Sequence, residues 1–425
     1  MTENFSPLVQ DTTKAQSESI ETVLSRLKSG RVYIPDYQRD AEQWDSHKKS
    51  LFIESVLNNL TIPAFFFCED ENRNYEVVDG QQRLSTIWDF FENKLIISDD
   101  SKIDYMAPAS ALYAGKKYEM LIQTLKNIFN DYPLTIIYLP KSLPLQTKLE
   151  IFRRINEGGT PLSGQDIRLA YYIRSKSVTF IRLVGIYSNS TDFVEDNLES
   201  DDDSTFTKKP FQRMLELAKG KGISHPWDNF PETSERWYEW WQGKDKAKGQ
   251  TPSLMFIWYL VSLERDKLDA LLKRPKHLPV TFGGLTETAL DIYCAQLQYQ
   301  EIDPGIEDKN ILSSFEIISN DYFKQFATWM RFILSKTLVG ISVDKYKQLA
   351  LFVAASVELK ISPENLTPNQ WQKAGEFIRN PRKVGKYVLN DEDGYPEPKG
   401  RWGGLKGQKQ QFEKTVEIVR ILLER

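Results

Sequence analysis

The apolar positions in the first part of the chain alternate between helical spacing and short continuous runs. Three stretches with apolar residues at i, i+3 and i+4 predict helices that begin near Ser17, Asp45 and Gln81. Apolar and aromatic runs between them predict short strands, and the mixture predicts an α+β fold. The expected core positions are Ile20, Val23, Leu24, Leu27, Leu51, Phe52, Val56, Leu60, Leu84, Ile87, Trp88 and Phe91, and the predicted strands are 31–35, 63–68, 75–78 and 134–139.

The rest of the chain has a mainly helical pattern. Helices are predicted near 211–219, 252–273, 284–297, 312–337, 343–359, 368–379 and 409–424. An acidic run over residues 195–205 is typical of a solvated loop or linker. We therefore expect a disordered N-terminus over residues 1–16, an α+β domain over residues 17–175 and a mainly helical region over residues 176–425.

Composition indicates the class of protein but does not identify a reaction. Of the 425 residues, 40% are hydrophobic and 27% are charged, as in ordinary globular proteins. No run approaches the roughly 18 apolar residues of a membrane span, and we expect a cytoplasmic protein. Two cysteines and three histidines exclude a disulfide framework and most zinc ligand sets. The formal net charge of −4 still allows a local basic groove, because DNA binding depends on where the charges lie.

The most informative motif is YEVVDGQQRLST, in which a predicted strand turns at Asp79-Gly80 into a helix. The first N–H groups of a helix have no partners within it and its dipole favours anions, so this turn suits phosphate. Gly80 has no Cβ to hinder a ligand, and Gln81 and Gln82 carry amides. Arg83 adds a forked cation that suits phosphate oxygens, and Asp79 would coordinate Mg²⁺ or fix the loop. The alternative is a plain turn in which Arg83 pairs with a nearby carboxylate.

Two further motifs place polar and charged residues on irregular connections. IPDYQR carries Gln38 and Arg39 and is followed by Trp44. FRRINEGGTPLS ends a predicted helix with two arginines before a Gly-Gly break. Adjacent helical residues point about 100° apart, so only one arginine is expected to face a site, and we favour Arg153 over Arg154.

The three motifs resemble, in their order, the N-terminal domain of GmrSD-type restriction endonucleases and related phage-defence proteins. The resemblance extends over roughly residues 17–175, and the motifs are IPDYQR…W, VVDGQQRLST and FRRINEGGTPLS. The resemblance implies a ParB/sulfiredoxin-like fold, and it implies NTP binding and hydrolysis at the DGQQR motif. Carried over position by position, the implied nucleotide site consists of Gln38, Arg39, Asp79, Gly80, Gln81, Gln82, Arg83, Arg153, Asn156 and Thr160.

The leading hypothesis is a phage-defence protein that binds a nucleoside triphosphate with Mg²⁺ and hydrolyses it to regulate action on foreign DNA. Asp79, Gln82 and Arg83 are the expected catalytic residues, with Asp79 as the Mg²⁺ ligand. The main alternative is a nucleotide or DNA sensor without turnover that recruits a partner nuclease, and a ParB-like nuclease ranks below it. The nucleotide base and the oligomeric state stay open.

Cleavage of DNA has no expected site in this chain. Members of the resembled family often end in an HNH nuclease domain, whose chemistry needs clustered histidines. The three histidines of this chain are scattered and lack that setting. The target, modified phage DNA included, would therefore be cut by a separate nuclease subunit or not at all.

A basic segment over residues 379–409 is the expected DNA contact. It contains eight Lys or Arg and four acids, a local charge of +4 (8 − 4), in a loop-like run rich in Gly and Pro. The alternative is a plain solvated loop. The expected DNA-binding residues are Arg382, Lys383, Lys386, Arg401 and Lys406.

Overall fold

The chain packs as two compact units, which are described separately. Unit 1 holds Met1–Pro161 with Ser200–Arg213, and unit 2 holds Leu162–Glu199 with Met214–Arg425. The structure is a computed structural model that describes residues 13–35, 44–70, 72–106, 109–141, 143, 147–148, 151, 154–155, 164–189, 210–244, 249–272, 288–302, 312–335, 340–390, 395 and 405–423.

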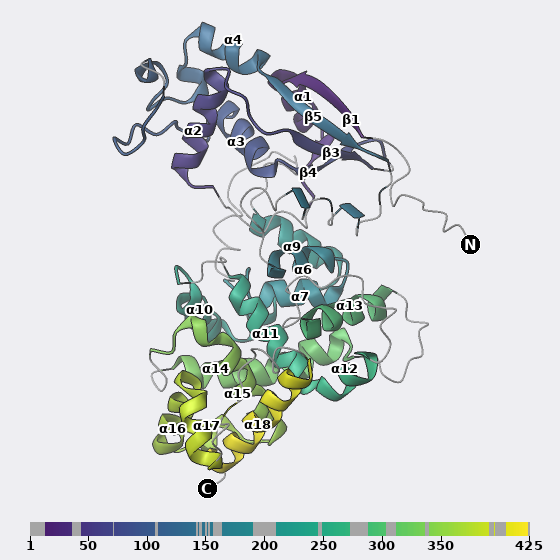
Figure 1. The fold of residues 1–425 in the computed structure, drawn as a ribbon, viewed down its shortest axis with the longest axis vertical. Helices are drawn as coiled ribbons and strands as arrows, with labels where there is room; N and C mark the ends of the chain where they lie inside the picture. Colours follow the sequence, from purple (N-terminus) through teal and green to yellow (C-terminus); the bar gives the residue numbers. More distant parts are fainter. Residues whose placement is uncertain are drawn as a thin grey trace, which may run out of the picture. The chain divides into compact units, whose positions relative to one another are not determined.

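Unit 1 is built on a five-stranded mixed sheet with strand order β1-β5-β3-β4-β2 (Figure 1). The strands are β1 Lys14–Ser19, β2 Val32–Tyr33, β3 Phe65–Glu69, β4 Tyr75–Asp79 and β5 Pro133–Leu139. Strand β1 is antiparallel to β5 and β3 to β4, whereas β5 runs parallel to β3 and β2 parallel to β4. The carboxyl ends of β2 and β4 therefore lie at the same edge of the sheet.

Helices cover one face of this sheet. They are α1 Ile20–Lys28, α2 Ser46–Leu57, α3 Gln81–Phe91 and α4 Gln123–Asp131, with short 3₁₀ turns at Ser110–Leu112 and Tyr118–Met120. Strand side chains alternate between the two faces, so Phe65, Phe67 and Val77 join the main core with the helices. Cys68 and Val78 point to the opposite face and form a smaller cluster. These elements establish the α+β fold expected for the first part of the chain.

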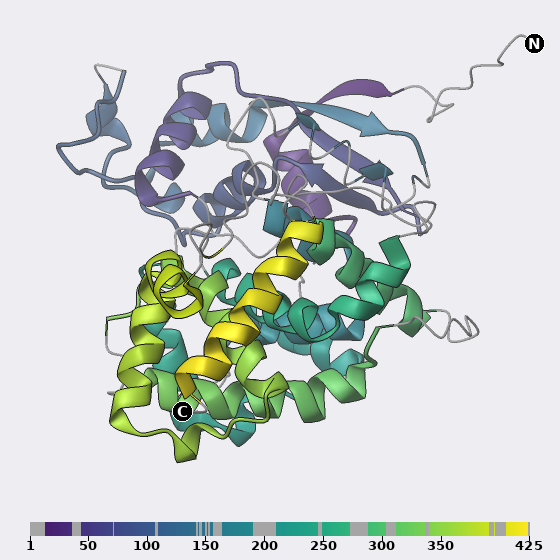
Figure 2. The same cartoon turned by 60° about the horizontal axis from the view of Figure 1, so that its bottom comes forward.

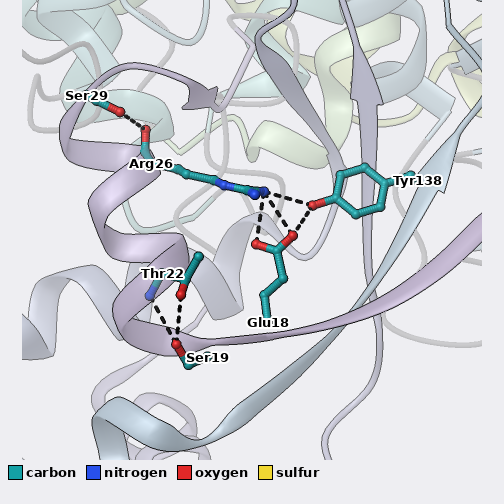
Figure 3. A network of polar contacts seen from close by, with 6 residues as sticks. All are labelled: Glu18, Ser19, Thr22, Arg26, Ser29 and Tyr138. Carbon is teal, nitrogen blue, oxygen red and sulfur yellow. Dashed lines mark hydrogen bonds and ion pairs between the residues drawn. The ribbon is translucent and has the colours of Figure 1, made fainter.

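The first helix confirms its predicted apolar stripe but starts later than expected. Its N-cap is Ser19 rather than Ser17, and the Ser19 hydroxyl accepts the Thr22 N–H at 3.3 Å. We expected residues 1–16 to be disordered, but Lys14–Ser19 forms β1, so this expectation is wrong for residues 14–16. The reason is pairing with β5, reinforced by the Glu18 carboxylate, which accepts hydrogen bonds from Arg26 at 2.9 Å and from the Tyr138 hydroxyl at 2.6 Å (Figure 3).

Two predicted core positions around α2 are wrong. Leu51 is exposed, and Leu60 is also exposed because it lies beyond the end of the helix. The buried face of α2 instead includes Ile53 and Glu54. The Glu54 carboxylate accepts the Tyr113 hydroxyl at 2.9 Å, which gives this buried polar group a hydrogen-bond partner.

Unit 2 is entirely helical in the residues that the structure describes. Its central helices, α11 and α15, are buried on nearly every side and pack together, and α18 lies across α15, α16 and α17 (Figure 2). The described α-helices with residues in unit 2 are α6 Gly164–Tyr171, α7 Lys176–Val184, α9 Pro210–Gly220 (in unit 2 from Met214), α10 Pro231–Trp241, α11 Gln250–Leu263, α12 Arg265–Leu272, α13 Thr288–Ile302, α14 Phe323–Leu334, α15 Tyr346–Glu358, α16 Pro368–Arg379, α17 Pro381–Leu389 and α18 Leu405–Leu423. None of the described helices is both long and apolar enough to cross a membrane.

Several predicted helices of unit 2 have different bounds. The run predicted over 252–273 breaks at Glu264, which is buried and accepts the Ser313 and Tyr322 hydroxyl groups. The run predicted over 312–337 contains a π-helical segment, Ile317–Tyr322, before α14. Helices α7, α10 and α17 were not predicted at all.

Candidate functional site

The β4–α3 turn, Asp79–Arg83, contains all five residues of the DGQQR motif. Strand β4 ends at Asp79, Gly80 has φ +101°, and α3 begins at Gln81. Residues with a side chain rarely adopt this backbone conformation. A Cβ on Gly80 would also overlap the Phe65 ring, with even the ring Cε1 only 3.1 Å away. Glycine is therefore required for the strand to pass directly into the helix here.

We expect Gly80→Ala to lower the free energy of unfolding by about 2 kcal/mol. The left-handed backbone costs alanine about 1 kcal/mol, and the overlap with Phe65 adds roughly another 1 kcal/mol. Gly30→Ala is the matched control, because Gly30 has φ +71° and no neighbouring atom within 4 Å of the added Cβ. Urea unfolding of the full chain measures both variants. Equal losses would show that Phe65 does not constrain the turn.

The Arg83 guanidinium is bonded within the turn. Its Nη2 donates to Asp79 Oδ2 at 2.7 Å, and its Nη1 donates to the carbonyl oxygens of Pro63 and, at 3.1 Å, Ala64. The guanidinium carbon also lies 4.9 Å from the centre of the Phe65 ring. The side chains of Arg83 and Asp79 are only 11% and 16% exposed. Arg83 thus ties the first turn of α3 to the start of β3, as in the alternative interpretation of the motif.

Burial opposes the charge on both members of this pair. Burial raises the pKa of Asp79 above its ordinary value, although the Arg83 charge and the Gly80 N–H act against that rise. Burial also lowers the pKa of Arg83, although Asp79 opposes this change. Each charge therefore depends on the other for compensation, and removing either partner leaves the second in a poorly solvated position.

The first turn of α3 presents the positive end of the helix dipole. No side chain caps it, and the first intrahelical bond runs from the Leu84 N–H to the Gly80 carbonyl oxygen at 2.8 Å. Gln81 and Gln82 are half-buried in this turn, and the Gln82 carbonyl oxygen accepts the Thr86 hydroxyl at 2.7 Å. The geometry suits an anionic group bound at the helix N-terminus.

The other predicted nucleotide-binding residues lie outside the described residues. Strand β2 ends at the same sheet edge as β4 and is followed by the buried residues Ile34 and Pro35. The predicted residues outside the description are Gln38, Arg39, Arg153, Asn156 and Thr160.

A known protein family matches this part of the chain. Residues 20–173 match the family model described as GmrSD restriction endonuclease, N-terminal domain. Over these residues the chain is similar to the N-terminal domain of GmrSD-type restriction endonucleases. No curated protein and no solved structure matches the chain. The match supports a restriction or anti-phage role with DNA as the target.

The GmrSD N-terminal domain match extends beyond unit 1. It includes α6, which packs in unit 2, where the Arg168 side chain donates to Asp291 of α13 at 2.7 Å. The sequence-based boundary at residue 175 lies close to the end of the match at residue 173, whereas the packing boundary falls after Pro161. The family match and the packing units therefore divide the chain at different points.

The β4–α3 turn does not fit the Mg²⁺ ion expected at Asp79. Mg²⁺ in nucleotide sites binds carboxylates and phosphates, and a compensated carboxylate attracts it weakly. Asp79 is already paired with Arg83, so a divalent cation at Asp79 would lie beside a guanidinium and be repelled. Within the described residues, no three His, Cys, Asp or Glu side chains lie close enough to hold a metal. We derive no catalytic step through Mg²⁺.

Three contacts of the β4–α3 turn were missed by the sequence analysis. The carbonyl oxygens of Pro63 and Ala64 hold Arg83, and the Phe65 ring lies against both Arg83 and Gly80. Every residue carries a backbone carbonyl group, so nothing in the sequence identifies the Pro63 and Ala64 carbonyl oxygens as partners of Arg83. Phe65 was recognised only as part of an apolar strand.

The predicted DNA-binding residues are only partly described. Arg382, Lys383 and Lys386 are exposed on α17, which is a helix and not the loop-like segment that we expected. Lys406 belongs to α18, where only its backbone is described, and Arg401 lies outside the described residues.

Proposed function

We propose that the β4–α3 turn binds the phosphates of a nucleoside triphosphate and that this binding regulates action on foreign DNA. The observation that carries the proposal is the start of α3: a helix N-terminus opens directly from a strand end at Gly80, with no side-chain cap. The family match supports the link to DNA restriction.

Each residue of the turn has a proposed role. Gln81 and Gln82 bind phosphate oxygens through their amides, and Gln82 orients the attacking water if the nucleotide is hydrolysed. Arg83 acts as a positioning residue, because Asp79 and the Ala64 carbonyl oxygen hold its guanidinium. The resemblance alone supports the remaining proposed contacts, which are Gln38, Arg39, Arg153, Asn156 and Thr160.

Gln81→Glu separates phosphate binding from helix stability. A carboxylate in the first turn interacts favourably with the helix dipole, so we expect stability to stay constant or to rise by about 0.5 kcal/mol. The same charge repels a phosphate, so nucleotide affinity is expected to fall about tenfold or more. Thermal unfolding and nucleotide titration of the full chain measure the two effects.

Gln123→Glu is the matched control for this substitution. Gln123 begins α4 in the same unit, and α4 likewise has no side-chain cap. We expect this control to leave nucleotide affinity unchanged. If both variants bind nucleotide as tightly as the wild type, the phosphate site is not at α3.

Turnover is tested by phosphate release from ATP, GTP, CTP and UTP with Mg²⁺, with and without DNA. Release that Gln82→Ala abolishes while nucleotide binding persists would support hydrolysis at this turn. Binding without release would leave a nucleotide sensor. Absence of binding with all four nucleotides, in a folded protein, would overturn the proposal.

A sensor without turnover is the second candidate function. The observation that favours it is the pairing of Asp79 with Arg83, because a compensated carboxylate is a poor general base. In this case nucleotide or DNA binding would recruit a separate nuclease subunit. Co-purification of nuclease activity that depends on nucleotide would support this candidate.

A further inference from the structure

Helix α17 in unit 2 has a basic and aromatic outer face. Four residues at i, i+1, i+4 and i+5 are exposed on one side of the helix: Arg382, Lys383, Lys386 and Tyr387. The helix contains no acidic residue. Arg379, at the end of the preceding helix α16, is also exposed. Cations are therefore concentrated at one exposed place in a chain with a formal net charge of −4.

The opposite side of α17 fixes the direction of this face. A Cβ on Gly385 would lie 3.0 Å from Tyr395 Cβ and 3.2 Å from Ile418 Cδ1, so α17 and α18 approach closely at this glycine. The Tyr395 hydroxyl in turn bonds the Thr415 hydroxyl of α18 at 2.8 Å. Because the inner side is packed in this way, the outer face is held toward solvent.

Core packing does not account for Tyr387. Its side chain is 88% exposed, and no hydrogen bond or ring contact of Tyr387 is found within the described part of the chain. Lys383 and Lys386 likewise form no ion pair with a described residue. The single acid of α16, Glu376, accepts a hydrogen bond from Gln372. Three further acids, Asp391–Asp393, follow in the sequence outside the described residues.

We propose that the outer face of α17 binds DNA, with its cations on the phosphates and Tyr387 stacked on an unpaired base. Charge complementarity selects a polyanion, and an exposed aromatic ring beside basic residues is the combination that single-stranded nucleic acid sites use. Among polyanions we favour DNA, because the family match supports DNA as the target. This surface extends the proposed function, since it lies in unit 2 and does not depend on nucleotide binding at the β4–α3 turn.

Fluorescence anisotropy of the full chain with single- and double-stranded oligonucleotides tests the proposal over a range of salt concentrations. We expect tighter binding to the single strand. Lys383→Gln with Lys386→Gln is expected to weaken binding about tenfold and to reduce the salt slope by roughly 1.4, at about 0.7 for each phosphate that is no longer neutralised. Tyr387→Ala is expected to weaken binding about tenfold with the salt slope unchanged, and Tyr387→Trp to restore it.

Matched controls come from other exposed positions of unit 2. Lys219→Gln with Lys324→Gln removes two exposed charges from α9 and α14, and Tyr299→Ala removes a part-exposed ring from α13. Both controls are expected to bind DNA as the wild type does. Equal losses in the controls and in the α17 variants would overturn the proposal. So would a chain that binds no DNA, or one that binds anionic phospholipid vesicles through α17 in place of DNA.

Discussion

Replacing Asp291 by asparagine is expected to lower the free energy of unfolding by about 3–5 kcal/mol, the range for breaking a buried ion pair from one side. Asp291 Oδ1 accepts a hydrogen bond from Arg168 Nε at 2.7 Å, and both side chains are completely buried. The substitution replaces the carboxylate that accepts from the fully buried Arg168 guanidinium by a neutral amide. Urea unfolding of the full chain, followed by tryptophan fluorescence, measures the loss.

Two further variants show whether the loss comes from an uncompensated charge. Arg168→Met with Asp291→Leu removes both charges and is expected to be less destabilising than Asp291→Asn alone. Glu358→Gln is the exposed control, because Glu358 pairs with Arg265 at 2.7 Å near the surface, and a loss under about 1 kcal/mol is expected. A double variant that is as unstable as the sum of its single variants would argue against charge compensation.

The boundary between the two packing units shows why this pair was not predicted. Arg168 was placed in the first domain because that domain and the family resemblance were taken to extend to residue 175. Its partner lies 123 residues away in α13, and no local pattern connects the two. A fully buried arginine also contradicts the usual preference of arginine for the surface, so only the packing assigns α6 to unit 2.

The spacing of apolar residues predicted helix α1, which buries one face, but it missed strand β1, which is held by backbone pairing with another strand. The stripe Ile20, Val23, Leu24 and Leu27 is buried in α1, because a helical period reports directly on one buried face. Strand β1 has the sequence KAQSES and is mostly exposed, so it carries no apolar alternation. Its backbone pairing with β5, from Lys14 with Tyr138 to Ser19 with Pro133, holds it in the sheet.

The local structure of the β4–α3 turn was predicted, but its internal contacts were not. The strand, Gly80 and the start of α3 follow from the spacing of the motif and the conformational freedom of glycine. The sequence analysis assigned Arg83 to phosphate because a forked cation in such a turn suits it. The structure places that cation on Asp79 and the Ala64 carbonyl oxygen, and this arrangement depends on how β3 packs beside α3.

Arg83→Met is expected to lower the free energy of unfolding by about 3 kcal/mol at neutral pH and by much less near pH 4. At neutral pH the substitution leaves Asp79 ionised, buried and without its cation. The charge and hydrogen bond of Arg83 lower the pKa of Asp79, so the pKa of Asp79 rises further when the arginine is lost. A carboxyl group with a raised pKa in the folded state binds protons more readily than in the unfolded chain. Stability therefore falls as pH increases from about 4 to the raised pKa.

Urea unfolding of the wild type and of Arg83→Met between pH 4 and pH 8 measures this dependence. Arg83→Met with Asp79→Asn has no carboxyl group at position 79, so the extra pH dependence of Arg83→Met is expected to disappear in this double variant. Lys49→Met is the control for an ordinary ion pair, because Lys49 contacts Asp89 at 3.3 Å with both side chains partly exposed. A pH-independent deficit in Arg83→Met would mean that Arg83 stabilises the turn through the Pro63 and Ala64 carbonyl oxygens rather than through Asp79. Nucleotide titration of Arg83→Met over the same pH range is a second readout. If Arg83→Met binds nucleotide weakly at neutral pH and regains affinity as pH falls, Arg83 acts by holding the turn and not by contacting phosphate.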